Sequence, residues 1–339
     1  MLARVTLVLL GLLTATAAAE APACWAPGDL AYRNGDEHVQ KGVKQARIAP
    51  PKRVLAEYSP IPQHGAVRRV KLPPGKKLLA LTFDLCEQPF EIAGYQGGIV
   101  DFLRTNRIKA TFFMGGKWML SHRERTQQLM SDPLFEVANH PFEHRNLRVV
   151  SGPALVDEIK NAQLAYEQVR DELQAKQCVG PGNHTIEQAP KRLGLFRFPY
   201  GACSPAALNE VANQGLLPIQ WDVSSGDPTF GQSARAIERQ VLANVAPGSI
   251  VLFHANGRGW HTEGALPGIV AGLKAQGYEL VTVSELLAAG EPVMTSTCYD
   301  SRPGDTDRWP RRLPVASGFG WPWQGVAQTT PAAPASRTR

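Results

Sequence analysis

Apolar runs of strand length alternate with amphipathic helical segments from Lys77 to the short helix that ends at Gly290. Seven strands are predicted, at residues 78–84, 109–114, 135–140, 195–200, 217–223, 249–254 and 278–283. The predicted helices span residues 97–106, 126–130, 153–176, 204–214, 233–245, 266–276 and 284–290. Nearly continuous apolar strands that alternate with helices are typical of a buried parallel sheet, arranged as a (β/α) barrel or as a doubly wound sheet.

The two ends of the chain differ from this alternating body. Residues 5–15 form an apolar segment after Arg4, and Ala17-Ala18-Ala19 supplies the small residues of a cleavage site. We therefore expect residues 1–19 to be a signal peptide, so that the mature protein is periplasmic or secreted and meets the membrane only through that peptide. Residues 20–75, rich in Pro and basic residues, are predicted to extend a main domain at 76–290. Residues 291–339 are expected to be a Pro- and Trp-rich tail whose end is disordered.

Composition excludes several classes of function. The formal net charge of +6 is modest, and the Lys and Arg residues form no stripe interleaved with aromatic residues, which argues against a nucleic-acid partner. No Gly-x-Gly-x-x-Gly string or phosphate-binding loop opens a predicted helix, so nucleotide binding has no support. The five cysteines form no Cys-x-x-Cys pair, and in an oxidising compartment we expect one or two disulfides with one thiol left over. Cys24 and Cys298, which flank the main domain, are a candidate pair.

Side chains with acid, base or metal-binding chemistry gather at the carboxyl ends of the predicted strands. They are Asp84, His140, His144, Arg197, Asp227 and His254. The carboxyl ends of parallel strands share one face of such a fold, and functional groups collect there. His140 and His144, four residues apart where a strand meets a loop, can turn toward one point and bind a divalent metal through neutral imidazole nitrogens. We therefore expect a metal-binding site at this rim.

Residues 78–289 resemble the polysaccharide deacetylase family, whose members share the chitooligosaccharide-deacetylase homology domain. The matching strings are Leu81-Thr82-Phe83-Asp84, His140-Pro141-Phe142-Glu143-His144, Arg197-Phe198-Pro199-Tyr200-Gly201, Trp221-Asp222-Val223-Ser224-Ser225-Gly226-Asp227 and Ile250-Val251-Leu252-Phe253-His254. The family fold is a distorted (β/α) barrel of about seven strands, which agrees with the count above. The resemblance implies a metal-dependent hydrolase that removes N-acetyl groups from an amino-sugar polymer or oligomer in the cell envelope, with residues 76–290 as its catalytic domain.

The resemblance implies how the metal and the attacking water would be handled. His140 and His144 would bind a divalent ion, expected to be Zn, with Co or Ni as alternatives. Asp84 would be the general base that takes a proton from the water. Arg197 would hold the Asp84 carboxylate ionised and oriented, because a nearby cation favours the charged form of an acid.

The resemblance also implies how the N-acetylated glycan would be held and cleaved. The backbone N–H of Tyr200 would face the developing oxyanion. His254, oriented by Asp227, would protonate the departing amine. The residues expected to line the substrate site are Pro199, Trp221, Leu252 and Trp260.

The first matching string departs from the family pattern, which usually reads Thr-Phe-Asp-Asp-Gly with the second Asp on the metal. Here Leu85 follows Asp84, and a leucine cannot bind a metal. A catalytic zinc usually has three protein ligands and a water, so the two histidines leave the ion short of a ligand. Glu87 is the preferred replacement, while Cys86, Asp84 itself or a second water are alternatives. Two other interpretations stay open: a metal-free relative that binds glycan without turnover, and a hydrolase of another small amide or imide.

Overall fold

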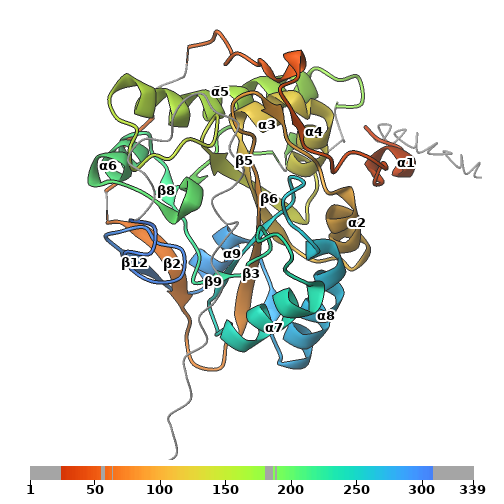
Figure 1. The fold of residues 1–339 in the computed structure, drawn as a ribbon, viewed down its shortest axis with the longest axis vertical. Coiled ribbons are helices and arrows are strands. Elements are labelled where there is room, and N and C mark those ends of the chain that lie inside the picture. Colours follow the sequence, from red (N-terminus) through yellow and green to blue (C-terminus); the bar gives the residue numbers. More distant parts are fainter. Residues whose placement is uncertain (1–23, 55–57, 63, 180–185, 188, 308–339) are drawn as a thin grey trace, which may run out of the picture.

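The central feature of the protein is a parallel sheet of eight strands that curls into a distorted (β/α) barrel (Figure 1). The computed structural model describes residues 24–54, 58–62, 64–179, 186–187 and 189–307. The predicted signal peptide and the predicted tail beyond residue 307 lie outside these residues. The strands are β3 (Leu78–Leu85), β5 (Ala110–Gly115), β6 (Phe135–His140), β7 (Leu195–Phe196), β8 (Leu217–Pro218), β9 (Val223–Ser224), β10 (Ile250–His254) and β11 (Glu279–Leu280). Their order is β8-β7-β6-β5-β3-β10-β9, with β11 also paired with β3, so the predicted fold class is confirmed.

Helices cover the outside of this sheet, as the alternating pattern predicts. The main ones are α2 (Gly97–Thr105), α3 (Gly116–Ser121), α4 (Arg123–Met130), α5 (Pro153–Gln174), α6 (Pro205–Asn213), α7 (Ala234–Asn244), α8 (Thr262–Ala275) and α9 (Val283–Ala288). Hydroxyl caps begin three of them: Ser204 accepts a hydrogen bond from Ala207 N, Ser233 accepts one from Ala236 N, and Thr282 accepts one from Glu285 N. The predicted apolar stripe of α5 is buried, from Leu155 through to Leu173. No helix among the described residues is long and apolar enough to cross a membrane.

The open side of the barrel is closed by two strands that the sequence pattern does not predict. β2 (Ala66–Lys71) pairs antiparallel with β12 (Glu291–Thr295), and we call this pair the β2–β12 ribbon (Figure 1). Val67 bridges to Ile219 just beyond β8, and Arg69 bridges to Ser249 just before β10. The predicted strand at 217–223 is therefore split into β8 and β9, because its middle residues turn to pair with β2.

Two disulfides fasten segments outside the sheet to the barrel. Cys24 is bonded to Cys178, which follows α5, and Cys203 is bonded to Cys298. The expected pairing of Cys24 with Cys298 is wrong, because each of the two flanking segments packs beside a different part of the barrel. The expectation of one leftover thiol is confirmed, since Cys86 is free and buried.

Candidate active site

The alternation of side chains along β3 directs Asp84 into the barrel mouth. Phe83 and Leu85 belong to the hydrophobic core, and successive side chains of a strand point to opposite faces. Asp84 therefore lies on the other face, where its Oδ1 accepts a hydrogen bond from Arg197 Nη1 at 2.8 Å. Its Oδ2 lies 3.8 Å from His140 Nε2. The structure thus brings three residues of the predicted site together around one carboxylate.

Arg197 is buried and held on every side. Its Nη1 also donates to Thr82 Oγ1 at 2.9 Å, while Nε and Nη2 each donate at 3.3 Å, to the carbonyl oxygens of Ile219 and Gln220. The guanidinium carbon lies over the ring of Phe113, 3.8 Å from the ring centroid. Burial lowers the pKa of Arg197 and the charge of Asp84 opposes that shift, so the side chain stays a cation at neutral pH. A cation fixed in this way leaves the Asp84 carboxylate little freedom to turn.

The two predicted metal ligands lie beside this carboxylate. His140 Nδ1 is 2.7 Å from the carbonyl oxygen of Arg197, which can only accept, so Nδ1 carries the proton and Nε2 presents a lone pair. His140 Nε2 is buried and has no hydrogen-bond partner among the residues that the structure describes. The ring centroids of His140 and His144 are 5.0 Å apart, and His144 has a left-handed backbone with φ of 54°. Burial lowers the pKa of both histidines, so both rings are neutral at neutral pH, the form that binds metals.

The third side chain of a metal-binding type beside the two histidines is Cys86. Glu87, the expected third ligand, points elsewhere. The Sγ atom of Cys86 and one ring nitrogen each of His140 and His144 lie within 4.8 Å of one another, and all three residues are buried. The Glu87 carboxylate instead accepts hydrogen bonds from Ser121 Oγ at 2.7 Å and from a backbone N–H. Burial raises the pKa of Glu87 to about 7. β3 ends at Leu85, so Cys86 and Glu87 lie just beyond the strand, and Cys86 rather than Glu87 is the residue whose side chain meets the two histidines.

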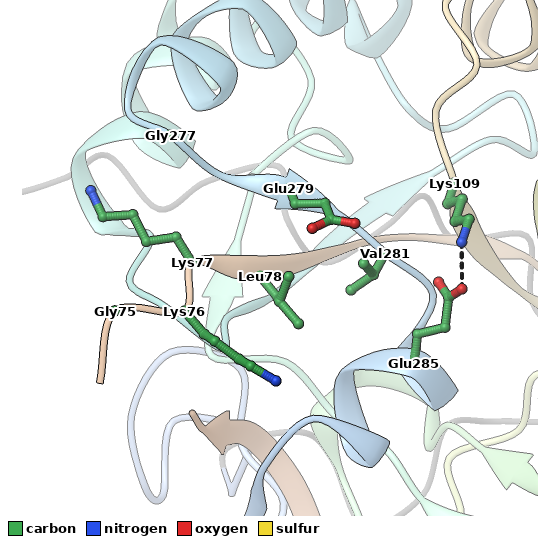
Figure 2. Close-up of a pocket in the computed structure, with 9 residues that line it drawn as sticks. All are labelled: Gly75, Lys76, Lys77, Leu78, Lys109, Gly277, Glu279, Val281 and Glu285. Carbon is green, nitrogen blue, oxygen red and sulfur yellow. Dashed lines mark hydrogen bonds and ion pairs between the residues drawn. The ribbon is translucent and has the colours of Figure 1, made fainter. Parts of the chain in front are cut away.

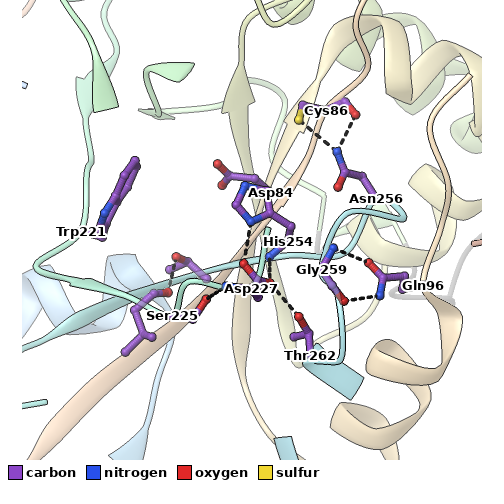
Figure 3. Close-up of polar contacts among 12 residues, drawn as sticks. Asp84, Cys86, Gln96, Trp221, Ser225, Asp227, His254, Asn256, Gly259 and Thr262 are labelled. Atoms are coloured by element: carbon purple, nitrogen blue, oxygen red, sulfur yellow. Dashed lines mark hydrogen bonds and ion pairs between the residues drawn. The ribbon is translucent and has the colours of Figure 1, made fainter. Parts of the chain in front are cut away.

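A histidine at the end of the neighbouring strand β10 pairs with an aspartate from the loop that follows β9. His254 ends β10 in register with Asp84, and its Nδ1 is 2.8 Å from Asp227 Oδ1 (Figure 3). The other oxygen of Asp227 accepts hydrogen bonds from the backbone N of His254 and from Thr262 Oγ1, both at 2.7 Å. Burial alone would lower the pKa of His254, but the charge of Asp227 and its hydrogen bond outweigh it and raise that pKa. The imidazole is therefore held in a form that can donate a proton from Nε2.

A tight turn carries the predicted oxyanion residue. The predicted strand at 195–200 ends at Phe196, and Pro199–Gly201 form a 3-10 turn in which Tyr200 has φ of 59°. The Tyr200 ring packs edge-on against His144 with centroids 4.6 Å apart. A Cβ on Gly201 would lie 2.9 Å from the backbone of Tyr299, so the segment linked through Cys298 presses directly on this turn. The turn next to the histidines is thus held from outside.

The four residues expected to line the substrate site are placed differently. Pro199, Trp221 and Leu252 are buried, and Trp221 Nε1 donates to Asp300 Oδ1 at 3.1 Å. Trp260 is 42% exposed, and its ring lies edge-on to that of Phe230, which is 75% exposed, at a centroid distance of 5.9 Å. Only Trp260 among the four therefore presents a large aromatic surface, and Phe230 beside it is missed by the sequence pattern.

Comparison with known proteins bears on this arrangement. The family model for polysaccharide deacetylase matches residues 71–219. A peptidoglycan-N-acetylglucosamine deacetylase of Bacillus cereus is 30% identical over 217 residues, which cover 63% of this chain and 70% of that protein. The chain belongs to the polysaccharide deacetylase family.

Other similar proteins are also named as peptidoglycan N-acetylglucosamine deacetylases. Peptidoglycan-N-acetylglucosamine deacetylase PgdA of Listeria monocytogenes is 28% identical over 210 residues, and the match covers 62% of this chain but 39% of PgdA. The chain therefore matches well under half the length of PgdA. Among solved structures, the Bc1960 peptidoglycan N-acetylglucosamine deacetylase has a TM-score of 0.53 at 24% identity, covering 67% of this chain and 94% of its own. BA3943, described as a CE4 family pseudoenzyme from Bacillus anthracis, has a TM-score of 0.52 at 23% identity, covering 68% and 70%. Both likenesses support the barrel fold.

A hollow of about 490 Å³ lies at the end of the barrel opposite to the mouth that holds Asp84 (Figure 2). It is lined by Lys76, Lys77 and Leu78 at the start of β3 and by an ion pair between Lys109 and Glu285. Asp84 lies near the other end of the same strand. The hollow therefore has no part in the arrangement around Asp84.

Proposed function

We propose that this protein is a metal-dependent hydrolase that removes N-acetyl groups from an amino-sugar polymer of the cell envelope. The observation that carries the proposal is the meeting of a carboxylate held by Arg197, two neutral histidines and a protonatable histidine at one end of the barrel. The relatives named as deacetylases of peptidoglycan and of chitooligosaccharides support this class of substrate. We place catalysis in residues 76–290.

His140 and His144 fit the divalent ion that the family implies. Both rings are buried and neutral, and His140 Nε2 has no hydrogen-bond partner in the described part of the chain. A bound Zn²⁺, or Co²⁺ or Ni²⁺ in its place, would polarise the acetyl carbonyl and lower the pKa of a water molecule.

The side chains of the barrel mouth divide the proton transfers between them. Asp84 is the general base: it takes a proton from the attacking water as the water oxygen bonds to the acetyl carbon. Arg197 donates a hydrogen bond to this carboxylate and keeps it pointing into the mouth. The backbone N–H of Tyr200 stabilises the negative charge that develops on the carbonyl oxygen.

His254 completes the reaction as the general acid. It donates its Nε2 proton to the amide nitrogen as the C–N bond breaks, so that the amine and acetate leave. Asp227 accepts from Nδ1 and stabilises the imidazolium, which keeps the proton on the nitrogen that faces the mouth. The base and the acid thus have different neighbours: Arg197 contacts Asp84, and Asp227 contacts His254 and raises its pKa.

We further propose that the protein acts in the periplasm or outside the cell. The apolar segment at residues 5–15 and the small residues after it support export. The two disulfides support an oxidising compartment, because such bonds are rare in the reducing cytosol.

Leu85 favours a second candidate function, a metal-free protein that binds glycan without turnover. It occupies the position of the acidic metal ligand that the family pattern carries, and its side chain is buried in the core. The two candidates differ in metal uptake and in acetate release.

Acetate release from chitin oligomers and from peptidoglycan, measured with and without a chelator, tests the proposed function. The purified protein is expected to release acetate, and chelation or His140→Ala is expected to abolish release. Asp84→Asn is expected to abolish release while the protein keeps its metal. His38→Ala is the matched control, because the His38 side chain is 72% exposed and lies outside the barrel mouth. An inactive, metal-free protein after supplementation with Zn, Co and Ni would favour the glycan binder.

A further inference from the structure

We propose that Cys86 is the third protein ligand, so that the metal centre consists of two imidazoles and one thiolate. This inference rests on the metal-dependent function proposed above, but it concerns only which atoms hold the ion. It departs from the family pattern, in which the ligand beside the two histidines is an aspartate at the position that Leu85 occupies here.

The distances permit such a centre with little movement. Sγ of Cys86 and a ring nitrogen of each histidine are within 4.8 Å of one another. With Zn–S near 2.3 Å and Zn–N near 2.0 Å, a tetrahedral zinc holds its sulfur and nitrogen ligands about 3.6 Å apart. The two nitrogens would stand about 3.3 Å apart in the same geometry, so the donor atoms need to close by no more than about 1.5 Å, which side-chain rotations supply.

The residues on either side of Cys86 are held elsewhere. Leu85, the last residue of β3, packs in the core with Phe83. Glu87 accepts a hydrogen bond from Ser121 Oγ, whereas the Sγ atom of Cys86 lies beside the two histidines. Cys86 is also the one free thiol among the described residues, because the other four cysteines form the two disulfides.

Neighbouring groups orient both kinds of ligand. The Asn256 side-chain amide donates to the Cys86 carbonyl oxygen at 2.8 Å and to Sγ at 3.1 Å (Figure 3). His140 donates its Nδ1 proton to the Arg197 carbonyl. Hydrogen bonds of this kind, made by the ligands to groups that do not touch the ion, are a regular property of protein metal sites.

The donor set predicts which ion is bound. A thiolate selects zinc and other thiophilic ions, imidazoles suit zinc, cobalt and nickel, and magnesium or calcium sites are built from oxygen atoms. Three protein ligands leave a fourth position open, as in catalytic zinc sites. On binding, the Cys86 S–H bond breaks, its proton goes to solvent, and the sulfur electron pair forms the bond to the ion.

Titration of the metal-free protein with Co²⁺, followed by electronic absorption, tests this assignment. The wild-type protein is expected to show a thiolate-to-cobalt charge-transfer band in the near ultraviolet. Cys86→Ser is expected to lose that band. Its Zn²⁺ affinity should fall by more than roughly 10–100-fold, which is the loss expected when only a group that orients a ligand is removed. Glu87→Gln is the matched control, expected to keep the band and bind Zn²⁺ within a few-fold of wild type. Circular dichroism checks that both variants fold.

The outcomes separate this inference from the proposed function. Cobalt bound to the wild-type protein without a charge-transfer band overturns the thiolate ligand, even if the protein releases acetate. Equal Zn²⁺ affinity in wild type and Cys86→Ser overturns it as well, as does a wild-type protein that takes up neither ion. The band together with a protein that never releases acetate supports the ligand and refutes the function. If Cys86→Ser does not fold, the wild-type spectrum and protection of the thiol from alkylation by Zn²⁺ decide the question.

Discussion

Replacing Arg197 with Met is expected to lower the free energy of unfolding by about 3–5 kcal/mol, the usual cost of breaking a buried ion pair by removing one partner. Arg197 is fully buried, and its guanidinium is the cation that contacts Asp84, at 2.8 Å. Its loss leaves the carboxylate in a site that admits little water. Two backbone carbonyl oxygens, of Ile219 and Gln220, lose a donor at the same time.

A double-mutant cycle isolates the charge from the loss of packing. Asp84→Asn removes the charge that Arg197→Met leaves unpaired, so the double variant should be more stable than the sum of the single changes by roughly 1–3 kcal/mol. Arg239→Met on the exposed side of α7 is the control, and a change within about 0.5 kcal/mol is expected there.

Urea unfolding at pH 7, followed by tryptophan fluorescence and circular dichroism, measures these differences. A chelator is included because a bound ion would add its own stabilisation to the folded state. If Arg197→Met costs less than about 1 kcal/mol, or if the two changes are additive, the buried ion pair does not stabilise the site.

Two further predictions concern the acid and the substrate. Asp227→Asn removes the negative charge that raises the pKa of His254 against the effect of burial. Because the general acid must be protonated, the alkaline limb of the pH–rate profile for acetate release should move to lower pH. An unmoved limb would exclude His254 as the acid. Trp260→Ala removes an exposed ring beside Phe230 and should raise the KM for polymers about fivefold, near 1 kcal/mol. The kcat and the KM for a disaccharide should stay unchanged. An equal effect on both substrates would mean that the ring does not bind the extended glycan chain.

The parallel sheet and the convergence at its rim can be predicted from the sequence. The strands β3, β5, β6 and β10 are buried on both faces, so their apolar runs are nearly continuous and easy to recognise. Asp84, His140 and His254 stand at or next to the carboxyl ends of three of these strands. Because parallel strands bring these ends to one face, their proximity follows from the order of elements alone.

Contacts between segments that are far apart in the sequence cannot be predicted from apolar runs or from the order of elements. β2 and β12 are short and are separated by more than two hundred residues, so no local pattern indicates that they pair. The choice between Cys86 and Glu87 depends on the path of the chain just beyond the end of β3 at Leu85, which no local pattern fixes. Chemical analogy with a carboxylate ligand points to Glu87, whereas the structure places Cys86 beside the histidines.

The β2–β12 ribbon makes the two flanks of the barrel depend on each other. A shortened protein that starts at Leu78 or stops at Gly290 keeps the residues around Asp84 but loses one strand of the ribbon. Starting at Leu78 removes β2, so the backbone groups of Gln220 and Gly248 that now bond to Val67 and Val70 would be open to water or to another chain. Stopping at Gly290 removes β12, so the edge of β2 that now pairs with β12 would be open in the same way. Trimmed versions chosen by the limits of family similarity should therefore aggregate on expression, whereas versions that retain both flanks should stay in solution.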